Sequence, residues 1–275
     1  MSASHPCITV TTDFGEQDGY VGAMKGAILR INPRATLVDV THQIPPQDIR
    51  AAAWVLRSAY ASFPAGTIHV VVVDPGVGTA RRLVAARMGA WTFLAPDNGV
   101  LDLVRRREGL QRAVAITDRR YANATISRTF HGRDILAPAA AHLSRGVPLD
   151  RLGPRIATLR PLSWPAPRRL AGGRQRGAIV HIDRFGNLIT NMTLPAAARN
   201  EAWMVRHRRR THPVARTYAG AHRNAILALV GSSGFVELAV RDGSAQARLH
   251  ARVGEAVELR PRVASARDVQ RTART

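Results

Sequence analysis

The chain has 275 residues, 45% of them hydrophobic, so it can bury a sizeable core and does not have the composition of a disordered protein. Its formal net charge is +21, and Lys25 is the only lysine among its 40 basic residues. Such a charge attracts polyanions without selectivity. No zinc finger, basic zipper region or RNP-like aromatic string is present to read bases, so we expect no specific nucleic-acid partner.

The compartment is suggested by the cysteine content and by the apolar runs. Cys7 is the only cysteine, which permits no intrachain disulfide and suits a reducing environment. Residues 1–6 show no basic region followed by an apolar run, so we expect no signal peptide. Aliphatic runs such as 70–73 are far shorter than the roughly 20 residues that span a bilayer. The sequence therefore predicts a cytoplasmic protein without a membrane partner.

Strands and helices alternate in the first part of the chain. Short β-branched or apolar runs predict strands at 8–12, 36–40, 68–73, 83–88 and 91–95. Apolar residues at helical spacing predict helices at 21–31 and 48–62. A continuously apolar strand such as 68–73 belongs in a sheet that is buried on both faces. We therefore predict an α/β N-terminal domain with a mainly parallel central sheet over residues 1–160.

The second part of the chain has a different character. Residues 161–175 are rich in proline, glycine and arginine and lack periodicity, which predicts a linker. Short strands separated by turns are predicted beyond it, at 177–182, 188–192, 225–230, 235–240 and 256–259. This pattern predicts a smaller all-β, barrel-like C-terminal domain over residues 176–262. Residues 263–275 are polar and predict a disordered tail.

Familiar cofactor and metal motifs are missing from the sequence. There is no GxxxxGK[ST] phosphate loop, no GxGxxG with an acidic residue at Rossmann spacing, and no GxSxG. There is also no HExxH and no cluster of cysteine and histidine. We therefore expect no metal and no cofactor.

Polar residues gather instead where the predicted strands end, which is where α/β sheets hold their ligands. The clusters are TDFG with Asp18, DPGVG with Arg81, PDNG, TFHGRD, DRFGN and GSSGF. Asp, Asn and Gly also stabilise ordinary turns, so each cluster taken alone has a structural explanation.

Taken together, the clusters and their surroundings resemble the S-adenosylmethionine hydroxide adenosyltransferases, relatives of the fluorinating and chlorinating enzymes. The resemblance covers roughly two thirds of the chain and is carried by TTDFGEQDGYVGAMKG, INPRATLVDVTHQIPPQDI, FPAGTIHVVVVDPGVGTARR, APDNGVL, TFHGRDILAPAAAHL, HIDRFGNLITNM and GSSGFVELAV. It implies hydrolysis of S-adenosylmethionine to adenosine and methionine, by attack of water on C5′ of the ribose. It also implies an α/β domain followed by a barrel-like domain, in a homotrimer that holds its ligand at subunit interfaces.

The resemblance implies that the attacking water is activated by Asp74, Arg81 and His131. Either Asp74 or His131 could be the base, and Arg81 would favour the developing hydroxide. The halide-using relatives carry tyrosine where Asp74 stands, and Tyr-Ser where His131 and Gly132 stand. Because the serine there helps to bind halide, the residues of this chain favour water as the nucleophile.

The same resemblance implies which residues bind the substrate: Asp13 for the ribose hydroxyls, Asp18, Asp183 and Ser232 for the methionine amine and carboxylate, Asn187 for adenine, and Phe130 beside the reacting centre. Asp97 and Asn98 also belong to the matched motifs, but we expect them to stabilise a turn.

Three alternatives to hydrolysis remain at this point. Halogenation of the same substrate is disfavoured by Asp74 and Gly132. A non-catalytic protein that binds S-adenosylmethionine or adenosine would keep Asp13 and Asn187. It would not need Asp74, Arg81 and His131. A nucleic-acid-binding function rests on charge alone. Chromatography of the products formed from S-adenosylmethionine distinguishes the enzymes from the binder.

Overall fold

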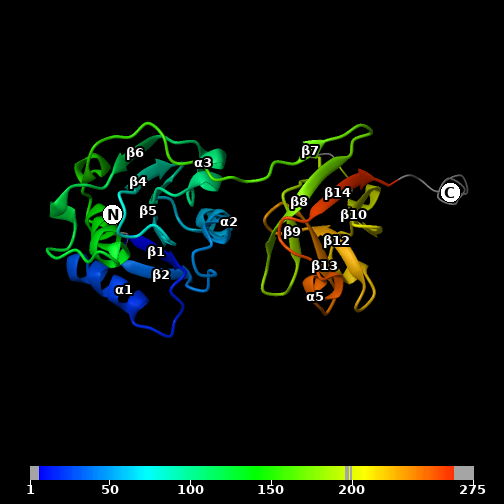
Figure 1. Ribbon diagram of the computed structural model, residues 1–275, viewed down its shortest axis with the longest axis horizontal. Coiled ribbons are helices and arrows are strands. Elements are labelled where there is room, and N and C mark those ends of the chain that lie inside the picture. Colours follow the sequence, from blue (N-terminus) through cyan, green and yellow to red (C-terminus); the bar gives the residue numbers. More distant parts are fainter. Residues whose placement is uncertain (1–5, 196–197, 199, 263–275) are drawn as a thin grey trace, which may run out of the picture. The chain divides into compact units, whose positions relative to one another are not determined.

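A computed structural model describes residues 6–195, 198 and 200–262, in which the chain divides into two compact units, Met1–Ser163 and Trp164–Thr275 (Figure 1). The expected tail at 263–275 lies outside the described residues. Within the segment expected to be a linker, Arg168–Arg169 forms β7 and pairs with β8 (Gln175–Ile182) of the second unit.

The first unit is built on a six-stranded sheet in the order β2-β1-β3-β5-β4-β6. Its strands are β1 (Cys7–Thr12), β2 (Thr36–Thr41), β3 (Ile68–Val72), β4 (Leu83–Met88), β5 (Trp91–Pro96) and β6 (Arg112–Ala115). The neighbours β2, β1, β3 and β5 are parallel, whereas β4 is antiparallel to both β5 and β6. The mainly parallel sheet predicted from the sequence is confirmed; β6 was not predicted.

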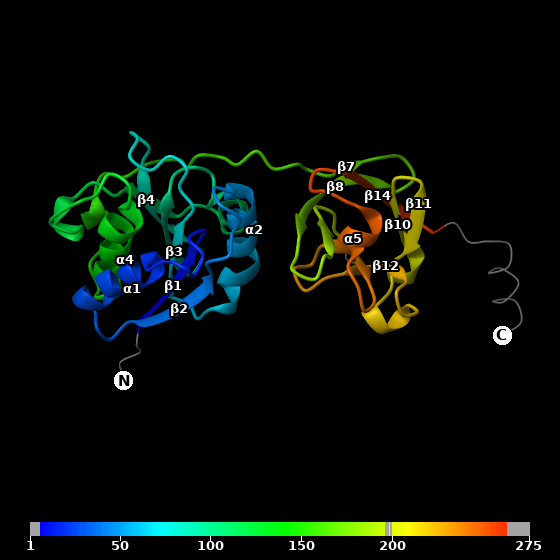
Figure 2. The ribbon, with the colours of Figure 1, turned by 60° about the horizontal axis from the view of Figure 1, so that its bottom comes forward.

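Helices cover both faces of this sheet (Figures 1 and 2). On one face α1 (Tyr20–Ile31) packs against α4 (Ala137–Ser144), and their apolar residues share a core with Ile8 and Val10 of β1. On the other face lie α2 (Ile49–Ala59) and α3 (Asp102–Glu108), which contact one another. Every residue of β3 is buried, as its continuous apolar sequence predicted.

A π-helical turn, η3 (Gly132–Leu136), precedes α4 and has a cause in the sequence. Pro138 has no N–H to donate to the carbonyl of Asp134, four residues earlier. That carbonyl instead accepts the backbone N–H of Asn123 at 2.8 Å. The exchange attaches the loop around Asn123 to the helical segment that begins after His131, and π-helical turns of this kind occur often at functional sites.

The second unit is an antiparallel sheet in the order β11-β10-β14-β8-β9-β13-β12, with β7 alongside β8. Its remaining elements are β9 (Leu188–Thr190), β10 (Trp203–His207), β11 (Arg210–Pro213), β12 (Ile226–Val230), β13 (Val236–Val240), α5 (Ala245–Leu249) and β14 (Ala256–Pro261). A bridge between Val214 and Ala228 brings the two edges together, so the sheet is nearly closed, as the predicted barrel-like domain requires. The β10–β11 hairpin was not predicted.

In the part of the chain that the structure describes, we find no helix that is both long and apolar enough to cross a membrane.

Candidate active site

The candidate site lies where three parallel strands of the first unit end. Strands β1, β3 and β5 are neighbours, and Thr12 of β1 is paired with Val72 of β3. Asp13 and Asp74 follow those strands within two residues, and Asn98 follows β5. Because the carboxyl ends of parallel strands meet at one edge of a sheet, these polar groups, far apart in the sequence, come together.

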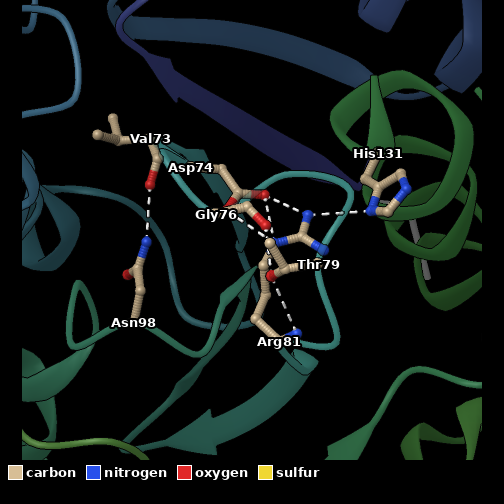
Figure 3. Close-up of polar contacts among 7 residues, drawn as sticks. All are labelled: Val73, Asp74, Gly76, Thr79, Arg81, Asn98 and His131. Atoms are coloured by element: carbon tan, nitrogen blue, oxygen red, sulfur yellow. Dashed lines mark hydrogen bonds and ion pairs between the residues drawn. The ribbon is translucent and has the colours of Figure 1, made fainter. Parts of the chain in front are cut away.

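Arg81 connects Asp74 to His131 (Figure 3). Its Nε donates to both carboxylate oxygens of Asp74, at 2.8 and 2.9 Å, and its Nη2 also contacts Oδ2. The same Nη2 lies 3.0 Å from Nδ1 of His131. The carboxylate side chain is only 7% exposed and the guanidinium side chain only 10%. The three residues that the resemblance implied as catalytic therefore form one continuous, largely buried chain of contacts.

The loop between Asp74 and Arg81 is shaped to turn the arginine back toward the carboxylate (Figure 3). The Thr79 hydroxyl donates to the carbonyl of Gly76 at 2.7 Å and accepts the backbone N–H of Arg81 at 3.3 Å. Gly78 has φ +81°, and a Cβ there would lie 2.8 Å from the backbone carbonyl oxygen of Arg128. Glycine is therefore required at this turn both for its conformation and for the close approach.

The contact with Arg81 determines the tautomer of His131. A guanidinium only donates hydrogen bonds, so Nδ1 of His131 accepts and the ring proton of the neutral form resides on Nε2. Burial lowers the pKa of His131 below its usual range, and the positive charge of Arg81 lowers it further. Asp74 and Asp134 oppose that shift. His131 is therefore neutral near pH 7, with Nε2–H as its only ring donor.

A cavity of about 260 Å³ opens beside this chain of contacts. Its walls include four residues that the resemblance had assigned to the site, namely Asp13, Asp74, Phe130 and His131. Oδ2 of Asp13 accepts the backbone N–H of Gln47 at 2.8 Å, which orients the carboxylate. The structure thus brings these residues together around one volume large enough for part of a small ligand.

Aromatic rings and a buried carboxylate hold this wall of the cavity in place. Phe130 packs edge-to-face against Phe14 and Tyr20, with ring centroids 5.7 and 5.4 Å away. Asp134, which is almost fully buried, accepts hydrogen bonds from the Asn123 amide, from the backbone of Ser127 and from its neighbouring arginine. Sequence reasoning missed Asp134, although it belongs to the FHGRD motif, because its partners lie in a loop without periodicity.

Asp97 and Asn98 have structural contacts, in agreement with the turn expected for them. The Asn98 amide donates to the carbonyl of Val73 at 2.8 Å and so ties the end of β5 to the residue before Asp74 (Figure 3). Asp97 accepts from the guanidinium of Arg82 and from the backbone N–H at position 160, at 2.9 and 2.7 Å.

The other residues implied by the resemblance lie elsewhere in the described chain. Asp18 is exposed, in the segment before α1, and is not among the residues that line the cavity. Asp183 and Asn187 contact each other in the second unit, where Oδ2 of Asp183 accepts the Asn187 amide N–H at 2.9 Å. Ser232 is exposed in the turn between β12 and β13.

Within the described residues, no group of three or more His, Cys, Asp or Glu side chains is arranged to hold a metal ion.

The chain is similar to known proteins along most of its length. Residues 8–153 match the SAM hydroxide adenosyltransferase N-terminal domain, and residues 177–258 match the corresponding C-terminal domain. The chain belongs to the SAM hydroxide adenosyltransferase family.

Individual relatives show how far the similarity extends. The (R)-S-adenosyl-L-methionine hydrolase of Salinispora arenicola is 40% identical over 88% of this chain and 93% of its own length. A fluorinase of an Actinoplanes species is 31% identical over 68% of this chain and 72% of its own. The crystal structure of an uncharacterized conserved protein from Thermotoga maritima superposes with a TM-score of 0.86 at 35% identity, covering 92% of this chain and 99% of that one.

Proposed function

We propose that this protein hydrolyses S-adenosyl-L-methionine to adenosine and L-methionine. The observation that carries the proposal is the continuous Asp74–Arg81–His131 chain of contacts at the wall of a cavity that Asp13 also lines. A protein that only bound the substrate would not need this set of groups, and withdrawing the Asp74–Arg81 pair from water carries a desolvation cost. Membership of the family and the 40% identity to a named hydrolase support the same reaction.

The chemistry explains why the site contains these groups and requires no cofactor. The substrate sulfur is a sulfonium, so it leaves as a neutral thioether and needs no acid. The nucleophile is the difficult partner, because the pKa of bulk water is about 15.7. The site must therefore hold one water in line with the C5′–S bond and accept its proton as the new C–O bond forms.

The geometry favours Asp74 over His131 as the group that accepts this proton. Nδ1 of His131 already accepts from Arg81, and its Nε2 bears a hydrogen in the neutral ring. Each carboxylate oxygen of Asp74 has two lone pairs, and Oδ1 is used at one of them by Nε of Arg81. In the proposed step the proton passes from water to Asp74, the hydroxide oxygen bonds to C5′, and the C5′–S electron pair leaves with methionine.

Arg81 and His131 then act on the oxygen while its charge develops. The positive guanidinium favours the developing negative charge, and its two nitrogens fix the direction of the carboxylate. The Nε2–H of His131 is available to donate a hydrogen bond to the water and hold it in line. Fixed donors of this kind, aimed at a developing negative charge, commonly contribute about 10²- to 10³-fold in rate.

The proposed roles in substrate binding follow the family resemblance. Asp13 would accept hydrogen bonds from the ribose hydroxyls, and its position in the cavity wall near Asp74 supports this role. Phe130 lines the same cavity and would pack beside the reacting carbon. We assign the adenine to Asn187, and the methionine amine and carboxylate to Asp18, Asp183 and Ser232.

The assembly and compartment belong to the same proposal. We propose a homotrimer with its sites at subunit interfaces, supported by the family resemblance. We also propose that the protein is cytoplasmic, because a chain with a single cysteine suits a reducing compartment. The test is multi-angle light scattering of the purified protein. A trimer has three times the 29.9 kDa mass of the chain, and a particle of one chain mass that is fully active would overturn the assembly.

Isotope labelling tests the reaction. The protein is incubated in ¹⁸O-water with the separated (R) and (S) sulfonium epimers of the substrate, because the Salinispora relative is named for the (R) form. The label should appear in the 5′-hydroxyl of adenosine, and methionine should be unlabelled. Excess chloride should give no 5′-chloro-5′-deoxyadenosine. Intact substrate after long incubation with folded protein would favour the non-catalytic binder. Labelled homoserine together with 5′-methylthioadenosine would mean that the side-chain carbon of the methionine part is attacked instead.

A further inference from the structure

A chain of hydrogen-bonded polar groups connects Asn187 to Glu237 in the second unit. Oε1 of Glu237 accepts the Tyr218 hydroxyl hydrogen at 2.8 Å. The oxygen of the same hydroxyl lies 3.4 Å from Nδ2 of Asn187, which also donates to Oδ2 of Asp183 at 2.9 Å. Asn187 and Glu237 are each only 6% exposed, whereas the Tyr218 residue between them is 42% exposed. The contacts run without a break from Asp183 to the carboxylate of Glu237 in β13.

The barrel is built to accommodate this carboxylate. Val236 and Leu238, on either side of Glu237, point into the main core of the unit, so Glu237 faces the opposite side of the sheet. A Cβ at Gly231 would lie 2.3 Å from Oε2 of Glu237, so the side chain occupies space that only glycine leaves open. Burial raises the pKa of Glu237, and the charge of Asp183 raises it further, while the bond from Tyr218 opposes the shift.

Hydrogen bonding fixes the direction of every bond in the chain. When Glu237 is ionised it can only accept, so the phenol donates its one hydrogen to Glu237 and its oxygen accepts from the Asn187 amide. The two hydrogens of Nδ2 are therefore directed at Tyr218 and Asp183. Reversing the amide would place its carbonyl against the carboxylate of Asp183. The remaining polar atom of this side chain, Oδ1, is an acceptor only.

We infer, on the basis of the proposed function, that Tyr218 and Glu237 fix the polarity of the Asn187 amide and thereby make the enzyme select a 6-aminopurine over a 6-oxopurine. An acceptor oxygen at this position takes a hydrogen bond from the exocyclic amine of adenine. The 6-oxo group of hypoxanthine places a second acceptor against it, and an unpaired buried acceptor is costly. Tyr218 and Glu237 are positioning residues in this scheme, because they act through Asn187.

The test compares kcat/KM for S-adenosyl-L-methionine and for its 6-oxo analogue, S-inosyl-L-methionine. The wild type should prefer the 6-amino substrate by at least about 10- to 100-fold, the usual discrimination of a well-placed amide against the wrong base. Tyr218→Phe removes the acceptor for one amide hydrogen, so that only Asp183 still opposes reversal of the amide. In Glu237→Gln the new side-chain amide can donate to the Tyr218 oxygen. The phenol hydrogen is then free to point at Asn187, which reverses the direction of both hydrogen bonds. Both variants should lower the preference about tenfold or more.

Tyr60→Phe is the matched control, because the Tyr60 hydroxyl donates to Glu108 in the first unit in the same way. It should keep the wild-type preference. General destabilisation lowers both rates together and leaves their ratio unchanged. A wild type that uses both substrates equally, or variants that hydrolyse the 6-amino substrate and retain the full preference, would overturn the inference. No turnover of S-adenosyl-L-methionine by the wild type would instead refute the proposed function.

Discussion

Replacing Arg81 by lysine tests whether the planar guanidinium, rather than its charge alone, supports the reaction. Two nitrogens of Arg81 contact different partners: Nε contacts both oxygens of Asp74, and Nη2 contacts Nδ1 of His131. A lysine has one nitrogen and cannot contact both partners in this geometry. At least one charge-assisted hydrogen bond, about 1.5 to 3 kcal/mol, is therefore lost.

If that bond supports the transition state, kcat should fall roughly 10- to 150-fold, since each 1.36 kcal/mol corresponds to a factor of ten in rate. KM should change little, because neither bond is proposed to hold the substrate. The assay is steady-state release of adenosine, followed by chromatography, with thermal unfolding measured in parallel to exclude loss of the fold.

Arg82→Lys is the matched control for this experiment. Arg82 also contacts a carboxylate through Nε and Nη2, that of Asp97, but its side chain is 46% exposed and its other partner is the carbonyl of Thr158 rather than a residue of the cavity. Its turnover should stay close to that of the wild type. A kcat for Arg81→Lys within about threefold of the wild type, or an equal loss in both variants, would refute the assigned role of the guanidinium.

Two further predictions concern buried positions near the sheet. Burial lowers the pKa of His69 to about 4, below its usual 6.5, so its neutral form contributes stability above pH 6.5 that is lost as the pH falls toward 4. Urea unfolding of His69→Gln at several pH values should show a decline shallower by about 3 kcal/mol over that range, and parallel curves would contradict this prediction. A Cβ at Gly132 would lie 3.0 Å from Val72 and 3.3 Å from Met24, so Gly132→Ala and Gly132→Ser should each lower stability by about 1–3 kcal/mol. The Gly132→Ser variant should not produce a chlorinated adenosine, because Asp74 and His131 still differ from the halogenase residues. An unchanged melting temperature in both variants would mean that Val72 and Met24 move aside without cost.

The parts of the fold that were predicted correctly are those with local signals. The apolar run at Ile68–Val72 and the helical spacing at Tyr20–Ile31 place β3 and α1 within a residue or two. Strand β6 and the hairpin β10–β11 were missed because their sequences combine arginine with short apolar stretches. The π-helical turn depends on Pro138 and on an acceptor provided by a distant loop, so no local periodicity indicates it.

The sequence by itself determined the residue types at the site, because Asp74, Arg81 and His131 stand in motifs that carry the family resemblance. Only the tertiary structure decided how they act together. His131 is 50 residues from Arg81, and their contact exists because η3 packs beside the end of β3. That contact settles the histidine tautomer, and the same logic settles the orientation of the Asn187 amide through Tyr218 and Glu237. The direction of a hydrogen bond depends on which partner is present, and partners distant in sequence meet only when the chain folds.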